Sequence, residues 1–175
     1  MPKNFRDDFI AIQSNLRDSA GGTTAAFEVT TRQLTGLLSE AAIRDFSITI
    51  DEPTSLGGSD RGPNPVELVL AALGACQEIT YRLYADTLDI PLNGVSVKLT
   101  GRLDLRGFFA VDEGVRPGLR DIQATVTIDS PASTDDIERL KATVDRHCPV
   151  LDILRNVTPV KTEYALRREP AKTAA

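Results

Sequence analysis

The sequence predicts an α+β domain with a mainly antiparallel sheet, and two observations support this prediction. Runs in which apolar and polar residues alternate, the pattern of half-buried strands, occur in groups along the chain. Segments with apolar residues at helical spacing separate these groups, which is typical of the α+β class. The 175 residues match the size of one domain. We therefore expect a single domain over residues 1–175, with a helical extension at 1–20 and a frayed tail at 167–175.

The first third of the chain predicts one helix and several strands. Residues 4–17 carry phenylalanine, isoleucine and leucine at helical spacing, which indicates a short amphipathic helix. Residues 27–38 indicate one or two strands, and residues 46–50 alternate between apolar and polar side chains as a half-buried strand does. A loop rich in glycine, proline and serine follows at residues 53–65.

The next segment predicts a long central helix. Asn64 is a favourable N-cap, Pro65 suits the first helical position, and Glu67 stands where a capping box requires it. We expect the helix to continue to about Leu88. Its first half, residues 68–76, is apolar on every side, so we expect that part to be enclosed on all sides.

The second half of the chain repeats the pattern of strands followed by helix. Alternation predicts strands at residues 95–105 and 122–128. Ser133 caps a second amphipathic helix, and residues 150–154 form a short helical turn. Alternation at residues 160–166 predicts a last strand.

Charge and hydropathy exclude several classes of protein. The formal net charge is −5, and the Lys and Arg residues form no basic stripe, so we expect no nucleic-acid partner and no anionic membrane surface. Charged residues interrupt the N-terminal segment, which therefore resembles neither a signal peptide nor a membrane span. We expect a cytoplasmic protein.

Two cysteines, Cys76 and Cys148, are the most informative side chains. In a reducing compartment such cysteines are inert, catalytic or redox-active rather than structural disulfides. The simplest interpretation of each is a small buried hydrophobic residue. Zinc needs three or four ligands, and only His147 and carboxylates could join the two thiols, so we expect no metal and no cofactor. His147 and Cys148 are adjacent, so their side chains diverge on a helix and cannot pair as base and nucleophile.

Three sequence segments resemble the OsmC/Ohr family of osmotically induced and organic-hydroperoxide-resistance proteins. They are GPNPVELVLAALGAC at residues 62–76, VRPG at 115–118 and CPVLDIL at 148–154, and the resemblance extends over roughly residues 43–164. It implies an intertwined homodimer in which antiparallel strands of both chains wrap long central helices. That arrangement would explain why residues 68–76 are apolar on every side.

The resemblance also implies an activity, that of a thiol-dependent peroxidase in oxidative-stress defence. Cys76 would be the thiol that reacts with an organic hydroperoxide, and Cys148 would resolve the resulting sulfenic acid into a disulfide. An external thiol or dithiol would then reduce that disulfide. The alternative is a non-catalytic OsmC-like dimer that binds a small apolar or acyl ligand and has inert cysteines.

Peroxidases of the family activate the thiol with an arginine that a glutamate often holds. Spacing to the cysteine places that arginine nearest Arg32. Alternation instead puts Arg44 on the same strand side as Phe46, which points inward, so we prefer Arg44 and rank Arg32 second. The family glutamate directly follows Asn-Pro, where this chain has Val66. Glu67 comes one residue later, and it either takes the role of that glutamate or closes the capping box.

A polar pair, Gln77 and Glu78, follows Cys76 where the family's peroxidases usually have an aromatic residue. A carboxylate close to Cys76 would raise the pKa of the thiol, because like charge disfavours the thiolate. We expect this pair to mark the point where the central helix meets a polar pocket or the partner chain.

Overall fold

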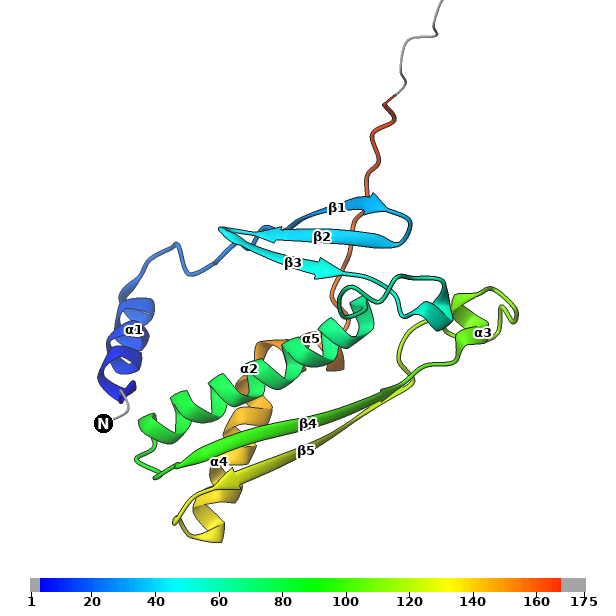
Figure 1. Cartoon of the computed structure of the whole chain (residues 1–175). Helices are drawn as coiled ribbons and strands as arrows, with labels where there is room; N and C mark the ends of the chain where they lie inside the picture. The colour runs from blue at the N-terminus through cyan, green and yellow to red at the C-terminus, as the bar shows by residue number, and fades with distance from the viewer. Residues whose placement is uncertain (1–3, 168–175) are drawn as a thin grey trace, which may run out of the picture.

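The computed structural model describes residues 4–167, and it confirms the α+β class with antiparallel sheets (Figure 1). In chain order the elements are α1 Arg6–Asp18, β1 Thr30–Thr35, β2 Leu38–Ile43, β3 Phe46–Ile50, the 3₁₀ turn η1 Thr54–Leu56, α2 Pro65–Thr87, β4 Gly94–Arg102, α3 Leu105–Phe108, β5 Asp121–Asp129, α4 Thr134–His147 and α5 Pro149–Arg155. Of the tail expected at 167–175, residues 168–175 lie outside the described part of the chain. That the chain forms one domain stays a prediction.

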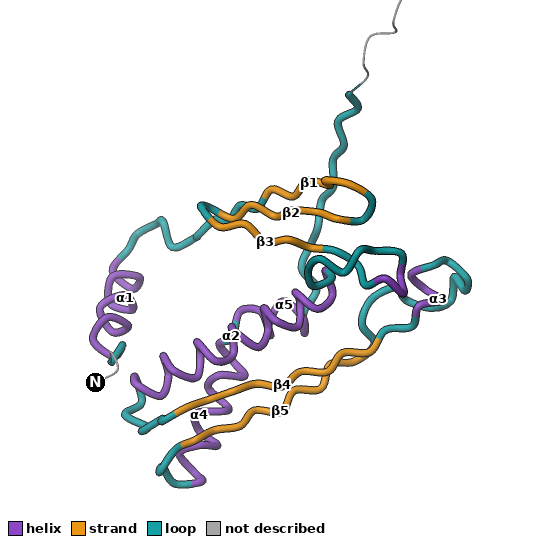
Figure 2. Tube along the Cα trace, viewed as in Figure 1, coloured by secondary structure: helices purple, strands orange, loops and turns teal. Residues whose placement is uncertain are grey.

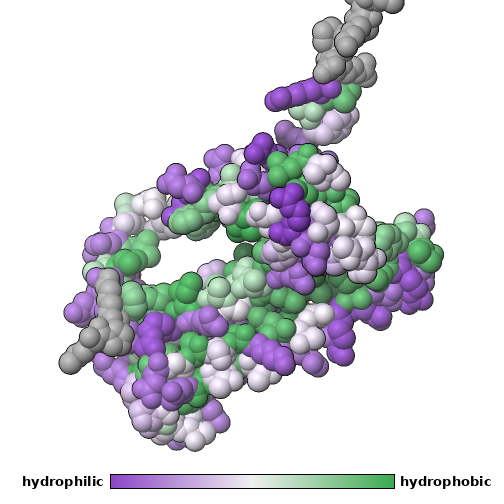
Figure 3. All heavy atoms as spheres, in the orientation of Figure 1, coloured by the Kyte–Doolittle hydropathy of each residue, from purple (hydrophilic) through white to green (hydrophobic). Residues whose placement is uncertain are grey.

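The N-terminal sheet consists of β1, β2 and β3 in that order, all antiparallel. The segment expected to hold one or two strands at residues 27–38 holds β1 and the first residue of β2. Every residue of β1 is exposed. Figure 3 shows an opening between this sheet and the rest of the molecule, with hydrophobic side chains along its edge. Within one chain the sheet therefore has no helix packed on it.

A buried carboxylate, Asp51, organises the loop between the N-terminal sheet and α2. It accepts hydrogen bonds from the backbone N–H of Glu52 at 2.8 Å, of Ser59 at 3.1 Å and of Arg61 at 3.2 Å, and from the Ser59 hydroxyl at 2.6 Å. A Cβ at Gly58 would lie 1.8 Å from the carbonyl oxygen of Glu52, so only glycine fits there. The loop is thus folded tightly against the end of β3.

The start of α2 confirms the expected capping box. The Asn64 side chain accepts from the Glu67 N–H at 2.8 Å, and the Glu67 carboxylate accepts from the Asn64 N–H at 2.8 Å. Such a reciprocal pair satisfies two of the backbone donors that every helix start leaves free. The helix ends at Thr87, with Leu88 as its C-cap.

The hairpin of β4 and β5 lies along α2, with α4 and α5 behind the helix in Figure 2. Its register extends from Gly94 opposite Asp129 to Arg102 opposite Asp121. The strand expected to continue to residue 105 ends at Arg102. Asp104 accepts a hydrogen bond from the Arg106 N–H and so caps the short helix α3.

The core of the chain lies between α2, α4, α5 and the inner face of the β4–β5 hairpin. Its buried residues are Leu73, Tyr81, Ala85, Ile90, Leu92, Leu140, Val144, Cys148 and Leu151. At the end of α2, α1 packs through an edge-to-face contact between Phe9 and Tyr84, with ring centroids 5.3 Å apart. No helix within residues 4–167 is both long enough and apolar enough to span a membrane.

Two expectations about buried surface are not met within a single chain. The first half of α2 is not enclosed on all sides, because Ala71, Ala75 and, one turn later, Ile79 are exposed. Residues 160–166 form no strand, and the side chains of Val160 and Tyr164 are 84% and 94% exposed. A strand needs the backbone of a neighbouring strand to accept and donate its hydrogen bonds, and none lies beside this segment in the described chain.

Candidate functional site

The two thiols meet at the junction of α2, α4 and α5. The Cys148 thiol donates a hydrogen bond to the Cys76 sulfur, and the two Sγ atoms lie 3.3 Å apart. Both cysteines are free. Cys148 is 1% exposed, whereas Cys76 is half-buried. The expectation that the two side chains come within bridging reach is therefore confirmed.

Packing of α4 places Cys148 against α2. Leu140 and Val144 lie one helical turn apart on the buried face of α4, and Cys148 comes one turn after Val144. The Cys148 N–H donates to the Val144 carbonyl at 2.9 Å, and the Cys148 carbonyl accepts from the Asp152 N–H at 3.0 Å. Cys148 therefore ends α4 and caps α5 at once, which fixes its backbone on both sides.

The environment of Cys148 keeps it protonated. Burial raises the pKa of the Cys148 thiol, and its hydrogen bond to Cys76 acts in the same direction. Close by, the Thr80 hydroxyl donates to the carbonyl of Cys76 at 2.7 Å. The pair thus consists of a half-buried Cys76 on α2 and a buried Cys148 whose thiol points at it.

His147 is engaged elsewhere. Its ring stacks on Tyr84, with centroids 5.2 Å apart and an angle of 27° between the planes. Because Tyr84 also contacts Phe9, a row of three rings connects α1, α2 and the end of α4. This row holds the residue that directly precedes Cys148.

Arg44 lies on the same side as Phe46, as expected, but that side is not buried within a single chain. Arg44 lies in the turn between β2 and β3 with a φ of 55°, and its guanidinium sits over the Phe46 ring, 5.1 Å from the centroid. Both side chains are exposed in this chain. That Arg44 takes part in a reactive site stays a prediction.

Arg32, on β1, is paired with a glutamate. Its Nε and Nη2 atoms donate to one oxygen of Glu40 on β2, at 3.1 and 2.9 Å. This hydrogen bond, first among the causes, lowers the pKa of the Glu40 carboxyl. The two residues face each other in the β1–β2 register, so the strand pairing itself orients the guanidinium.

One chain brings together two of the five residues expected at the site. Cys76 and Cys148 meet, while Arg32 and Arg44 lie on the N-terminal sheet, which does not pack on α2. Glu67 is committed to the capping box. Its side chain therefore serves the start of the helix in this structure.

Of the two polar residues after Cys76, only Glu78 has a side-chain hydrogen-bond partner among the described residues. The Glu78 carboxylate accepts a hydrogen bond from the Val97 N–H of β4 at 3.2 Å, so it faces the hairpin. Gln77 is 5% exposed, and its Oε1 has no hydrogen-bond partner among the described residues. It lines a groove of about 820 Å³ beside α2. The sequence predicted that this pair meets a polar pocket or the partner chain. The groove at Gln77 is lined mostly by apolar residues, and the sequence did not indicate which residues form its walls.

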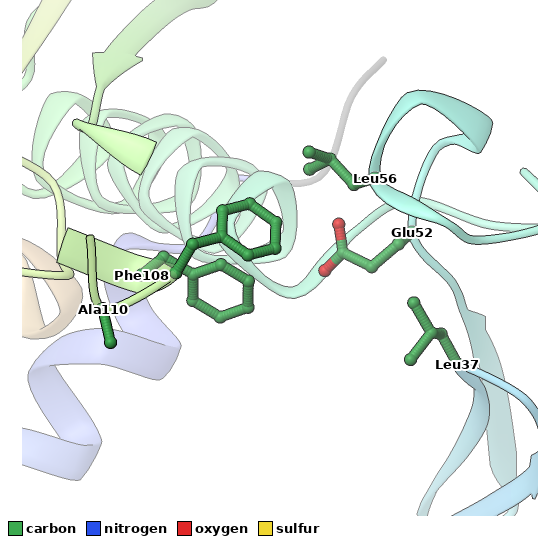
Figure 4. Close-up of a pocket in the computed structure, with 6 residues that line it drawn as sticks. Leu37, Glu52, Leu56, Phe108 and Ala110 are labelled. Carbon is green, nitrogen blue, oxygen red and sulfur yellow. The ribbon is translucent and has the colours of Figure 1, made fainter. Parts of the chain in front are cut away.

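A second hollow, of about 600 Å³, separates the N-terminal sheet from the segment around α3. In Figure 4, Leu37, Glu52 and Leu56 line one side of it, and Phe108 and Ala110 line the other. It contains no thiol, and Glu52 is its single titratable lining residue. Within residues 4–167 no group of three or more His, Cys, Asp or Glu side chains is arranged to hold a metal ion. The cysteine pair therefore remains the candidate reactive centre.

Comparisons with known proteins agree on one family. A family model described as OsmC-like protein matches residues 57–163. The hydroperoxide reductase of Mycoplasma pneumoniae is 29% identical over 136 residues, which are 73% of this chain and 89% of that protein.

Solved structures give the same result. The crystal structure of an OsmC-like protein from Mycoplasma pneumoniae superimposes with a TM-score of 0.67 at 25% identity, over 76% of this chain and 89% of that one. An organic hydroperoxide resistance protein from Legionella pneumophila shares the fold, with a TM-score of 0.59 at 21% identity over 75% and 92% of the two chains. Since the family model covers more than half of the sequence, the chain belongs to the OsmC-like protein family.

Proposed function

We propose that this protein is a thiol peroxidase that reduces organic hydroperoxides, with Cys76 as the reacting thiol and Cys148 as the resolving thiol. The observation that carries the proposal is the 3.3 Å separation of the two Sγ atoms, combined with their unequal burial. The name of the Mycoplasma pneumoniae relative, hydroperoxide reductase, supports the same activity.

The unequal burial suits two different roles. Cys76 is the less buried of the two residues, so we place the reaction with the peroxide there. Cys148 is buried, and its raised pKa keeps it as a thiol that does not compete for peroxide. Its sulfur lies within reach of the sulfenic acid that forms at Cys76.

Each step balances in atoms and electrons. The Cys76 thiolate attacks the terminal peroxide oxygen, so that an S–O bond forms, the O–O bond breaks and the alkoxide leaves to become an alcohol. The Cys148 sulfur then attacks the Cys76 sulfur, an S–S bond forms, and the hydroxyl leaves as water with the proton from Cys148. An external thiol or dithiol reduces the disulfide and is itself oxidised.

The activating arginine would come from a second copy of the chain. The exposed face of α2, the uncovered N-terminal sheet and the unpaired segment at residues 160–166 are the surfaces that an intertwined homodimer would cover. We place Arg32 at the thiol of the partner in preference to Arg44. Arg32 is already oriented by Glu40, and an arginine held by a glutamate is what the family resemblance implies.

Replacing the cysteines one at a time tests the two roles. Cys76→Ser should abolish consumption of cumene hydroperoxide. Cys148→Ser should consume one equivalent and stop at a sulfenic acid on Cys76 that dimedone labels. The double variant gives the background rate, because the chain has two cysteines. Wild-type turnover by either single variant would contradict the proposal and favour a non-catalytic ligand-binding protein.

Replacing the arginines tests the activating charge. Arg32→Ala should slow the first step by on the order of 10-fold to 100-fold, because the loss of a nearby cation raises the pKa of the attacking thiol. Arg44→Ala is the matched control on the same sheet and should leave the rate within about twofold of wild type. The rate is read as loss of the Cys76 thiol in the Cys148→Ser background. The reverse order of effects would assign the role to Arg44.

A further inference from the structure

The groove beside α2 has a long apolar floor within a single chain. One stripe of the helix lines it, formed by Val66, Val69, Leu73, Gln77 and Tyr81. At a rise of about 1.5 Å per residue, this stripe is over 20 Å long. The opposite walls come from the inner face of β5 and from α5, including Ile122, Val126 and Leu151. A groove of this length and apolar character fits an extended hydrocarbon chain.

Three arginines line the groove, and its two carboxylates are already paired, Asp121 with Arg102 and Asp145 with Lys141. Arg116 and Arg120 come from the loop before β5, which lies near the start of α2, and Arg155 closes α5. Neither Arg116 nor Arg155 forms an ion pair with any described residue, and Arg120 reaches Asp104 at 3.6 Å. Exposed guanidinium groups beside an apolar groove are suited to hold a carboxylate.

One unsatisfied polar atom lies further along α2. Gln77 is 95% buried (5% exposed), and its Oε1 has no partner among the described residues, which is costly for a buried amide oxygen. Tyr81 is the next lining residue, one turn further along α2. Burial, followed by the nearby Asp145 carboxylate, raises the pKa of Tyr81 to about 12, so its hydroxyl remains a neutral donor. An amide and a hydroxyl together can both donate to and accept from one ligand oxygen.

We propose that this groove binds an acyl anion whose carboxylate lies at Arg116 and Arg155, whose chain covers Val69 and Leu73, and whose far end carries a hydroxyl-type oxygen that pairs with Gln77. The site is separate from the thiol pair, because neither cysteine lines the groove. It does not depend on the proposed peroxidase activity, and a protein without reactive thiols would keep it.

Calorimetric titration with three probes of equal chain length tests each part of the site. These probes are ω-hydroxydodecanoate, dodecanoate and dodecanol, each used below its micellar concentration. We expect the hydroxy acid to bind most tightly, about fivefold above dodecanoate for one added hydrogen bond. Dodecanol, which lacks the charge, should bind at least about 10-fold more weakly than dodecanoate.

Variants assign these preferences to residues. Arg116→Ala with Arg155→Ala should remove the preference for dodecanoate over dodecanol, whereas Arg146→Ala, an exposed arginine outside the groove, should not. Gln77→Leu should remove the preference for the hydroxyl while dodecanoate still binds, which also shows that this variant folds. Cys76→Ser should bind like wild type even where peroxidase activity is lost.

Three outcomes would overturn the proposal. They are no binding of the two acids, equal binding of all three probes, and preferences that the groove variants leave unchanged. If a second copy of the chain fills the groove instead, the dimer will bind none of the probes.

Discussion

The two antiparallel sheets of this protein differ in what covers them. In the helix–hairpin body, formed by α2, β4, β5, α4 and α5, the inner faces meet each other, and Leu140 and Val144 are 0% exposed. In the N-terminal sheet, β1 buries nothing, and Phe46 on β3 is exposed. Both sheets are antiparallel, but tight turns join β1, β2 and β3, whereas residues 103–120, which include α3, join β4 to β5. An alternation of apolar and polar residues shows that one face of a strand can be buried. Whether that face is buried depends on which other element packs against it.

The two regions are joined by a rigid connection rather than a loose linker. Asp51 fixes the loop that leads from β3 to α2 through four hydrogen bonds. The sheet is therefore held at a defined distance from α2, with the opening seen in Figure 3. A fixed gap lined by hydrophobic side chains is suited to receive a second copy of the chain, as the proposed dimer requires.

The largest effect is expected from truncating a buried side chain in the helix–hairpin body. Leu140→Ala should lower the free energy of unfolding by about 3 kcal/mol, because it removes a fully buried side chain and leaves a cavity. Urea denaturation measures this. The matched variant Leu34→Ala removes the same atoms from an exposed position of β1 and should cost under about 1 kcal/mol within one chain. An equal loss would show that a second copy buries the sheet.

An intermediate effect is expected from a charge on the open face of α2. Ile79 is 61% exposed, so Ile79→Glu should leave the fold of one chain intact. It should weaken self-association by on the order of 30-fold, since a carboxylate would enter an apolar interface. Light scattering over a range of concentrations measures the mass, and Ser96→Glu on the outer side of β4 is the control. Unchanged association in Ile79→Glu would exclude this face from the interface.

The smallest effect is expected in the loop between β3 and α2, and only at low pH. The hydrogen bond from Ser59, first among the causes, lowers the pKa of Asp51. The stabilisation by the carboxylate is therefore present above its unfolded pKa of about 4 and is lost as the pH falls through the lower folded value. In Asp51→Asn the melting temperature should fall less steeply than in the wild type as the pH drops below about 4. Asp60→Asn, on the same loop but exposed, should keep the wild-type slope.

Sequence reasoning succeeded where the governing interactions are local. The capping box of Asn64 and Glu67 and the start of α4 at Ser133 depend on residues within one turn of each other. It failed where an element needs distant backbone. Residues 160–166 alternate like a strand but have no neighbouring strand in the described part of the chain.

The sequence by itself determined the family, most of the helix and strand order and the two candidate cysteines, because short motifs and periodicity record these directly. It missed α3 and predicted a last strand at 160–166 that does not form in the described chain. Only the tertiary structure decided that Cys148 lies 3.3 Å from Cys76 and that Gln77 faces a groove without a partner. It also paired Arg32 with Glu40. These facts depend on how helices cross and strands register over long separations, and packing of whole elements sets that geometry.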